Sequence, residues 1–471
     1  MDDVGPVIGE EPSRHRTRDP LRQLDDSQAL EGAVRGRTAG PGGEHPVHSQ
    51  SIVALVPIDQ GTGPTGVLTG LKVVELAQLV AGGMPGSLLA DFGADVVHVE
   101  DPGSGDLLRG LGPEKEGINL WWKVAGRNKR LVSIDLRHPE GQALARRLAA
   151  WADVVVTNFR AGTLERWQLD FPSLQRLNPT LIMLQISALG ATGPARDVPG
   201  FGKIGEARSG AAHLSGSPDG GPVFAGYLLS DAATALMGAL AVQMALYRRA
   251  HNPEFRGEWI DDTLSEPLFR LIDWQVVVHD QLGVIPTRTG GGPWITEPTL
   301  TRTAATADGR WIVISASALD EVRALAGVVG QDACDSWDEV GRRRQALDVA
   351  VDAWIIERAA DAALAILAEA GVVAAAILDI ADIFADPTYA EREDIITVAD
   401  PDLGPVRMQT VIPRFVNHPG TVWRCGASVG EDNRFVLQEF LGLSEDDCST
   451  LAHSGALGPP PSGIQRSETN E

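Results

Sequence analysis

Residues 68–190 alternate between short apolar runs and helical segments, and this alternation limits the chain to few folds. One strand–helix–strand unit runs from LTGLKVVELA to DVVHVE, a second runs from LVSIDL to DVVVTNF, and a further strand ends in PTLIMLQISALG. Strands joined through helices pair in parallel, because each crossover returns the chain to the same end of the sheet. The sequence therefore predicts an α/β fold with a Rossmann-like parallel sheet covered by helices.

Ligands of such sheets bind beyond the carboxyl ends of the strands. The polar residues that fall there are Glu100, Arg137, Asn158 and Ser187. The AGGMPG run after the first strand departs from the GxGxxG pattern, although Glu100 stands where a ribose hydroxyl would be bound. A dinucleotide enzyme is thus one alternative, and close packing of helix on strand is the simpler interpretation of these glycines.

Composition divides the chain into segments. Residues 1–66 mix Pro, Gly and charged residues without apolar periodicity, which predicts a disordered N-terminal extension. The later segments are a large Rossmann-like domain at 67–265, a linker at 266–284, a smaller α+β domain at 285–395, a return to the large domain at 396–457 and a disordered tail at 458–471.

The chain of 471 residues has a formal net charge of −23, which argues against nucleic acid or an anionic membrane as partner. We see neither an uninterrupted apolar run of about 18 residues nor an N-terminal signal segment. The cysteines Cys334, Cys425 and Cys448 are far apart and lack CxxC spacing. This pattern gives no metal motif and favours a reducing compartment, with the cytoplasm as the expectation.

Asp231 precedes an uncharged apolar run from Ala232 to Leu246, which predicts a helix buried around most of its circumference. A carboxylate at that position could cap the helix and complement its dipole. Held still between Gly226, Ser230 and the helix, it could also attack an acyl group as a nucleophile. The residues alone leave both interpretations open.

Several arginines could form a positively charged entrance to a binding site for a phosphate-bearing ligand in this acidic chain. They are Arg109, Arg130, Arg137, Arg160 and Arg166. Solvated surface arginines are the alternative interpretation. Glu206, in GEARSG, is either a second carboxylate near Asp231 or a surface residue of a helix.

Short blocks between Leu68 and Leu457 follow a familiar order: LTGLKVVELAQLVAGGMPGSLLADFGADVVHVEDPGSGDLLRG, NKRLVSIDLRHPEG, ADVVVTNFRAGTLERW, PGFGKIGEARSG and SDAATALMGAL. This order resembles the class III CoA-transferases of the CaiB/BaiF type, the group that contains formyl-CoA transferase, carnitine CoA-transferase and α-methylacyl-CoA racemase. The resemblance implies that the large domain binds CoA. It also implies a homodimer whose two subunits interlock like rings.

The resemblance further implies transfer of CoA from an acyl-CoA thioester to a free carboxylic acid. Asp231 matches the nucleophile that would form first a mixed anhydride and then an aspartyl-CoA thioester. Such a site must be dry, because water would hydrolyse the anhydride. No permanently bound cofactor is expected, since the CoA thioester is itself a substrate.

The same resemblance assigns CoA contacts to Leu136, Arg137, Asn158, Phe159 and Arg166. Gly290, Gly291 and Gly292 match a mobile glycine loop that would donate N–H groups to the intermediates. An ordinary domain linker is the alternative interpretation of these three glycines.

Two departures bear on the reaction. The racemase branch has a histidine base in a PGHD-like segment, whereas this chain reads PGFG with Phe201 and Gly202. Without that base racemisation is disfavoured, so racemisation or isomerisation is only the second hypothesis, after CoA transfer. Val80 stands where formyl-CoA transferase has glutamine, which disfavours formyl and oxalyl groups. A non-catalytic CoA-thioester binding protein is the third hypothesis, and the presence of Asp231 argues against it.

Overall fold

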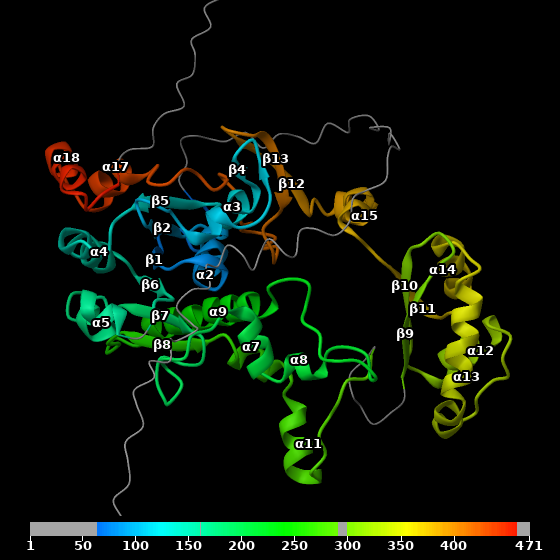
Figure 1. Cartoon of the computed structure of the whole chain (residues 1–471). Helices are drawn as coiled ribbons and strands as arrows, with labels where there is room; N and C mark the ends of the chain where they lie inside the picture. Colours follow the sequence, from blue (N-terminus) through cyan, green and yellow to red (C-terminus); the bar gives the residue numbers. More distant parts are fainter. Residues whose placement is uncertain (1–63, 161, 291–298, 459–471) are drawn as a thin grey trace, which may run out of the picture. The chain divides into compact units, whose positions relative to one another are not determined.

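The computed structural model describes residues 64–160, 162–290 and 299–458, so the expectations for 1–63, Gly291, Gly292 and 459–471 fall outside the described residues. A six-stranded sheet, parallel throughout, organises the first half of the chain (Figure 1). Its strands are β1 (Lys72–Leu76), β2 (Asp95–Glu100), β5 (Lys129–Ser133), β6 (Val154–Thr157), β7 (Ile182–Ser187) and β8 (Glu258–Thr263). The predicted α/β class and Rossmann-like parallel sheet are confirmed.

Both faces of the sheet are buried, as in other parallel sheets flanked by helices. Val74 and Val155 face a core built with α4 (Pro139–Trp151), α5 (Thr163–Trp167) and α6 (Phe171–Gln175). Val73 and Val154 face the opposite core, built with α2 (Leu79–Asp91) and α9 (Leu229–His251). Each strand therefore reads as a nearly continuous apolar run.

The strand order β5-β2-β1-β6-β7-β8 reverses direction between β1 and β6. This reversal is the point at which doubly wound sheets open a crevice for ligands. Here the Asn158 side chain spans it, accepting from Gln78 N at 3.0 Å and donating to Gln78 O at 2.7 Å. The two strand ends are thereby held in register at the edge where the ligand is expected.

Helix α9 packs on the sheet through a face of small residues. Ser230 and Thr234 donate to the carbonyls of Leu264 and Thr263, and a Cβ on Gly238 would come within 2.8 Å of Leu184. The opposite face is exposed at Leu236, Leu240, Met244 and Tyr247. Among the described residues α9 alone is long and apolar enough to cross a bilayer, but its small-residue face belongs to the core.

Further helices flank α9 in the chain: α7 (Gly202–Arg208) and α8 (Ala211–Leu214) before it, and α10 (Glu266–Leu271) and α11 (Trp274–Leu282) after β8. Helix α11 has no buried residue in the described structure. Because isolated helices of nine residues are marginal in water, this helix lacks the packing that would normally stabilise it.

A smaller α+β unit has a core of its own. Its antiparallel strands are β9 (Leu300–Ala305), β10 (Trp311–Ala316) and β11 (Val373–Ile377), and its helices are α12 (Leu319–Val328), α13 (Trp337–Ile355) and α14 (Ala360–Glu369). In β11, pairing with β10 overrides the helical propensity of the Ala-rich VAAAI sequence.

The remaining elements are short. Between β2 and β5 lie η1 (Leu107–Gly110), β3 (Glu114–Lys115), β4 (Ile118–Asn119) and α3 (Leu120–Ala125). After β11 come α15 (Ile380–Ala385), α16 (Pro387–Glu391), the hairpin of β12 (Ile395–Asp400) and β13 (Gly404–Gln409), then α17 (Asn433–Phe435), η2 (Val436–Phe440) and α18 (Glu445–Ser454).

The C-terminal segment lines the edge strand β5 with side chains instead of a further strand. Asp432 accepts from Leu131 N at 2.7 Å, and Asn433 accepts from Ser133 N at 2.8 Å. Val436 and Leu437 join the core on the α4 side of the sheet. The outward-facing N–H groups of β5 are thus occupied.

Candidate active site

Asp231 lies at the carboxyl edge of the large sheet. Helix α9 leads into β8, and a crossover helix runs antiparallel to the strands it connects. Its first turn therefore lies at the same edge as the residues that follow β1 and β6. The topology brings Asp231, Gln78 and Asn158 to one edge although they are up to 153 positions apart (231 − 78).

The cap interpretation of Asp231 is wrong, because α9 begins at Leu229 and Asp231 is its third residue. A Cβ built on Gly202 would lie 1.9 Å from Asp231 Oδ2, so only glycine leaves room for the carboxylate there. Burial raises the pKa of Asp231, the neighbouring Glu206 adds to this shift, and Lys203 opposes it. Desolvation thus outweighs the favourable helix dipole, leaving a more basic and more nucleophilic carboxylate.

Glu206 is a buried residue of α7, so its interpretation as a surface residue is wrong. Its carboxylate pairs with Lys203 Nζ at 2.8 Å and accepts from Ala225 N at 3.1 Å. Lys203 also donates to Ala225 O at 2.8 Å. Together they tie α7 to the segment that enters α9, which fixes the backbone before Asp231.

Three of the residues assigned to CoA by resemblance are engaged in the fold itself. Asn158 spans the β1–β6 gap, Leu136 is buried in the core on the α4 side, and Phe159 packs edge-on against Trp167 at 5.2 Å between ring centroids. They shape the edge of the sheet. Their contact with CoA stays a prediction.

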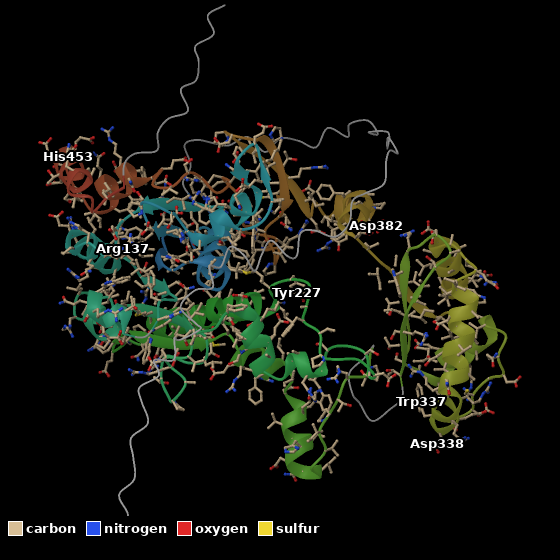
Figure 2. The ribbon with its side chains drawn as sticks, in the orientation of Figure 1. Arg137, Tyr227, Trp337, Asp338, Asp382 and His453 are labelled. Atoms are coloured by element: carbon tan, nitrogen blue, oxygen red, sulfur yellow. The ribbon has the colours of Figure 1, made fainter. Side chains whose placement is uncertain are left out.

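The arginines differ in how far their charge is already neutralised. Arg137, labelled in Figure 2 beside α4, pairs with Asp101 and Asp135, and Arg109 pairs with Glu100 at 2.6 Å. Exposed Arg160 and Arg166 have no ion-pair partner among the described residues. These two follow β6 and are the cations left free for an anionic ligand.

The dinucleotide alternative is weakened by the same contacts, because Glu100 is buried with both carboxylate oxygens on Arg109. Of the predicted glycine loop only Gly290 is described. It has a positive φ of 82° and lies against Pro218. Among the described residues, no cluster of three His, Cys, Asp or Glu side chains could hold a metal ion.

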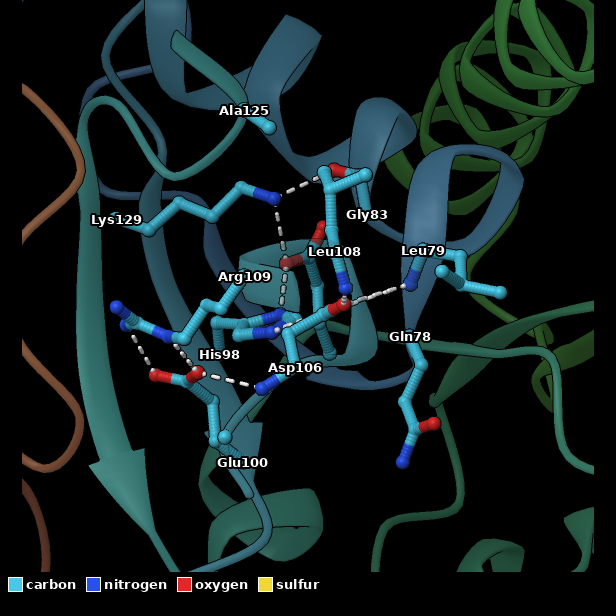
Figure 3. A network of polar contacts seen from close by, with 12 residues as sticks. Gln78, Leu79, Gly83, His98, Glu100, Asp106, Leu108, Arg109, Ala125 and Lys129 are labelled. Carbon is cyan, nitrogen blue, oxygen red and sulfur yellow. Dashed lines mark hydrogen bonds and ion pairs between the residues drawn. The ribbon is translucent and has the colours of Figure 1, made fainter. Parts of the chain in front are cut away.

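A buried polar network on the α2 face of the sheet was not predicted from the sequence; it is formed by Glu75, His98, Asp106 and Lys129 (Figure 3). A charged residue within each of the apolar runs VVEL and DVVHVE was the available signal. The network adjoins Leu79, whose φ of 61° is unusual for a residue other than glycine. Leu79 and Val80 line a cavity of about 230 Å³ beside this turn.

Comparison with known proteins gives a consistent result. Residues 68–433 match the family model described as CoA-transferase family III. The chain is 40% identical over 395 residues to succinyl-CoA–D-citramalate CoA-transferase of Chloroflexus aurantiacus, a match that covers 82% of this chain and 97% of that protein. It is 35% identical over 409 residues to the beta subunit of succinyl-CoA–L-malate CoA-transferase from the same organism, covering 83% and 98%.

A solved structure agrees with these sequence matches. The crystal structure of a CaiB/BaiF family protein from Brucella suis superposes with a TM-score of 0.71 at 31% identity. The match covers 80% of this chain and 100% of that protein. The large sheet and the smaller α+β unit therefore belong to one recurrent architecture.

Proposed function

The chain belongs to CoA-transferase family III, and on that premise we propose that it moves CoA from succinyl-CoA to a short dicarboxylic acid through a covalent intermediate on Asp231. Transfer of CoA between an acyl-CoA and a free acid is the activity of its named relatives. Succinyl-CoA as donor and a C4 or C5 hydroxy-dicarboxylic acid as acceptor are proposed from the names of those relatives.

The proposed reaction proceeds through two anhydrides. An Asp231 oxygen attacks the thioester carbonyl, the C–S bond breaks, and CoA leaves as a thiolate. The thiolate attacks the Asp231 acyl carbon of the anhydride, which releases the donor acid and leaves an aspartyl-CoA thioester. The acceptor carboxylate then displaces CoA to form a second anhydride, and the thiolate attacks its acceptor carbonyl, restoring the Asp231 carboxylate.

The observation that carries the proposal is the desolvated Asp231 carboxylate against Gly202. Burial makes an otherwise weak nucleophile more reactive, and it limits hydrolysis of the anhydride. The isomerase alternative is not favoured. Phe201 stands where the racemase branch has its histidine base, and a phenylalanine cannot exchange an α-proton.

For CoA we propose a site beyond the end of β6, where Arg160 and Arg166 would meet the phosphates and Phe159 would offer an apolar surface. Leu136, Asn158 and Arg137 complete the proposed set, although Arg137 already bears two aspartates. We propose that the glycines 290–292 supply N–H donors during transfer.

We further propose a homodimer in the cytoplasm. The exposed face of α9 and the unburied helix α11 each present apolar side chains that a second subunit would cover. The three cysteines are buried and unpaired, which suits a reducing compartment.

The intermediate can be trapped chemically. Enzyme mixed with succinyl-CoA and then hydroxylamine should acquire a hydroxamate on Asp231, detected by peptide mass spectrometry. Asp231→Asn should fold and lose CoA transfer by at least about 10³-fold, in the range measured for lost nucleophiles. Asp262→Asn, which removes another poorly solvated acid, should keep both turnover and labelling.

Turnover retained by Asp231→Asn, or a hydroxamate on a different residue, would refute the covalent role of Asp231. Exchange of the α-hydrogen with deuterated water in the absence of an acceptor acid would instead support the isomerase alternative.

A further inference from the structure

A buried histidine lies between two carboxylates beneath the β1–α2 turn (Figure 3). His98 Nδ1 is 2.8 Å from Glu75 Oε2, and His98 Nε2 is 3.2 Å from Asp106 Oδ2. All three residues are at most 1% exposed. Nδ1 is hydrogen-bonded to Glu75, whereas Nε2 lies within ion-pair distance of Asp106 but has no hydrogen-bond partner among the described residues. A doubly protonated ring makes both contacts attractive.

The surroundings favour the doubly protonated form. Burial by itself would lower the pKa of His98, but the Asp106 and Glu75 carboxylates outweigh it and raise that pKa to about 9. The facing charged groups are Glu75 on β1, Asp106 after β2 and Lys129 on β5, whose Nζ is 2.9 Å from Glu75 Oε2. The positive charges of His98 and Lys129 thus compensate the negative charges of Glu75 and Asp106 inside a buried site.

Asp106 connects this balance to the backbone at the ligand edge. Its carboxylate accepts from Leu79 N at 3.0 and 3.2 Å and from Leu108 N at 2.8 Å. The ion pair with His98 holds the pKa of Asp106 below its ordinary value despite burial. Glu100, paired with Arg109, accepts from Asp106 N at 2.8 Å. The Asp106 carboxylate is therefore held by the N–H groups of Leu79 and Leu108 and by the nearby charge of His98.

The residue that Asp106 holds is strained. Leu79 has a left-handed φ of 61°, which persists only where neighbouring groups enforce it. Asn158 pins the preceding residue, Gln78, through its N–H and its carbonyl. The first turn of α2, at the same edge as Asp231, is thus set by one amide and one carboxylate.

We propose that His98 is a positioning residue for the transfer site: its imidazolium fixes Asp106, which holds the Leu79 backbone and so the wall that α2 presents to the acyl group. The proposal rests on the proposed function, because the transfer reaction gives the kinetic readout. Loss of the His98 proton would free one side of the Asp106 carboxylate and let the turn relax.

A spectroscopic test does not depend on catalysis. In full-length protein labelled with ¹⁵N-histidine, the His98 signals, assigned by their absence in His98→Gln, should show both ring nitrogens protonated at pH 7.5 and should titrate near pH 9. A neutral His98 ring at pH 7.5 would overturn the proposal even if the protein proves to be an active CoA-transferase.

A kinetic test separates positioning from stability. At pH 7.5, His98→Gln should lower kcat about tenfold or more while KM for the CoA thioester changes less than about threefold, because the reacting groups are misplaced rather than unbound. The matched control is Arg302→Gln, which removes a partly buried cation paired with Asp348 and Asp352 in the smaller α+β unit. It should lower stability and leave kcat unchanged.

A pH profile supplies the third readout. Wild-type kcat should fall as pH rises through about 9, and His98→Lys, which restores the cation, should recover kcat and move this fall to higher pH. If His98→Gln does not fold, the wild-type and His98→Lys profiles still test the proposal. Identical alkaline profiles in those two proteins, or a His98→Gln variant with wild-type kcat, would contradict it.

Failure of this proposal is distinct from failure of the proposed function. Turnover that survives in Asp231→Asn would remove the covalent mechanism without altering the protonation state found for His98.

Discussion

Asp231 and Asp262 are acids whose protonation is set by burial near α9. The Asp231 carboxylate lies against Gly202. Asp262, on β8, accepts from Thr263 N at 2.8 Å through Oδ1, while its buried Oδ2 has no hydrogen-bond partner within the described ranges. Burial raises the pKa of Asp262 to about 7, with Glu266 and Asp261 adding to the shift.

The raised pKa of Asp262 predicts that Asp262→Asn increases the free energy of unfolding by an amount that depends on pH. Between about pH 4 and pH 7 the native state retains a proton that the unfolded chain releases, so stability falls as pH rises through this window and remains lower above it. Asparagine keeps the Thr263 bond and removes the buried charge. Urea unfolding should show a gain of about 1–3 kcal/mol at pH 8 and almost none at pH 4.

The control for this measurement is Asp219→Asn, an exposed aspartate that does not contribute to the shift at Asp262, and this variant should not give the same pH-dependent gain. A gain of equal size at pH 4 and pH 8 would show that ionisation of Asp262 is not its source.

Individual site residues were only partly predictable. Asp231 stands out in the sequence because an apolar helix follows it, but the two aspartates that neutralise Arg137 could not be assigned without the fold. His98 reads as one polar residue in an apolar strand. Its part in the buried ion-pair network depends on the parallel register, which places Glu75 beside His98 and Val96 beside Lys129.

At the scale of elements, the placement of α9 depends on a glycine that the sequence presents as a helix breaker. Gly238 lies in the helix interior, where glycine is unfavourable, yet it permits close approach to Leu184 and Asp262. The position of the helix that carries Asp231 is thus set by the contact of Gly238 with Leu184, two turns after Asp231. The strands and their parallel pairing follow from alternation, whereas the strand order and the contact between Gly238 and Leu184 could be seen only in the folded structure.

This arrangement predicts opposite outcomes for two glycine-to-alanine substitutions. Gly341→Ala, in α13 where an added Cβ would meet nothing within 4 Å, should stabilise the protein by about 0.5–1 kcal/mol through helix propensity. Gly238→Ala should lose that gain or destabilise, because the new Cβ would lie 2.8 Å from Leu184 Cδ2. Thermal unfolding measures both, and equal stabilisation would refute the close seating of α9.

On the scale of the whole molecule, apolar surface is left uncovered in one region of the chain. Leu240 and Met244 on α9 are 49% and 61% exposed, and α11 buries none of its residues in the described structure. Soluble monomers seldom leave such surface in contact with water. The overall architecture was predictable from alternation and block order, but the uncovered helix faces were not, since an apolar helix reads as buried in the sequence.

A second subunit should therefore be required for the folded state. We expect light scattering after gel filtration to give twice the chain mass for this protein expressed alone, and Leu240→Glu with Met244→Glu to yield monomer or aggregate. Leu177→Glu, at an exposed site after α6, should leave the mass unchanged. A stable, folded wild-type monomer would contradict this requirement. A chain that stays soluble only together with a different subunit would instead point to a hetero-oligomer, as some relatives are named as alpha and beta subunits.

The side chains of Asp432 and Asn433 on β5 have one more consequence. They satisfy the N–H groups of Leu131 and Ser133 that would otherwise template a strand from another molecule. The segment that carries Asp432 and Asn433 thereby protects this edge of the sheet against strand addition by another molecule.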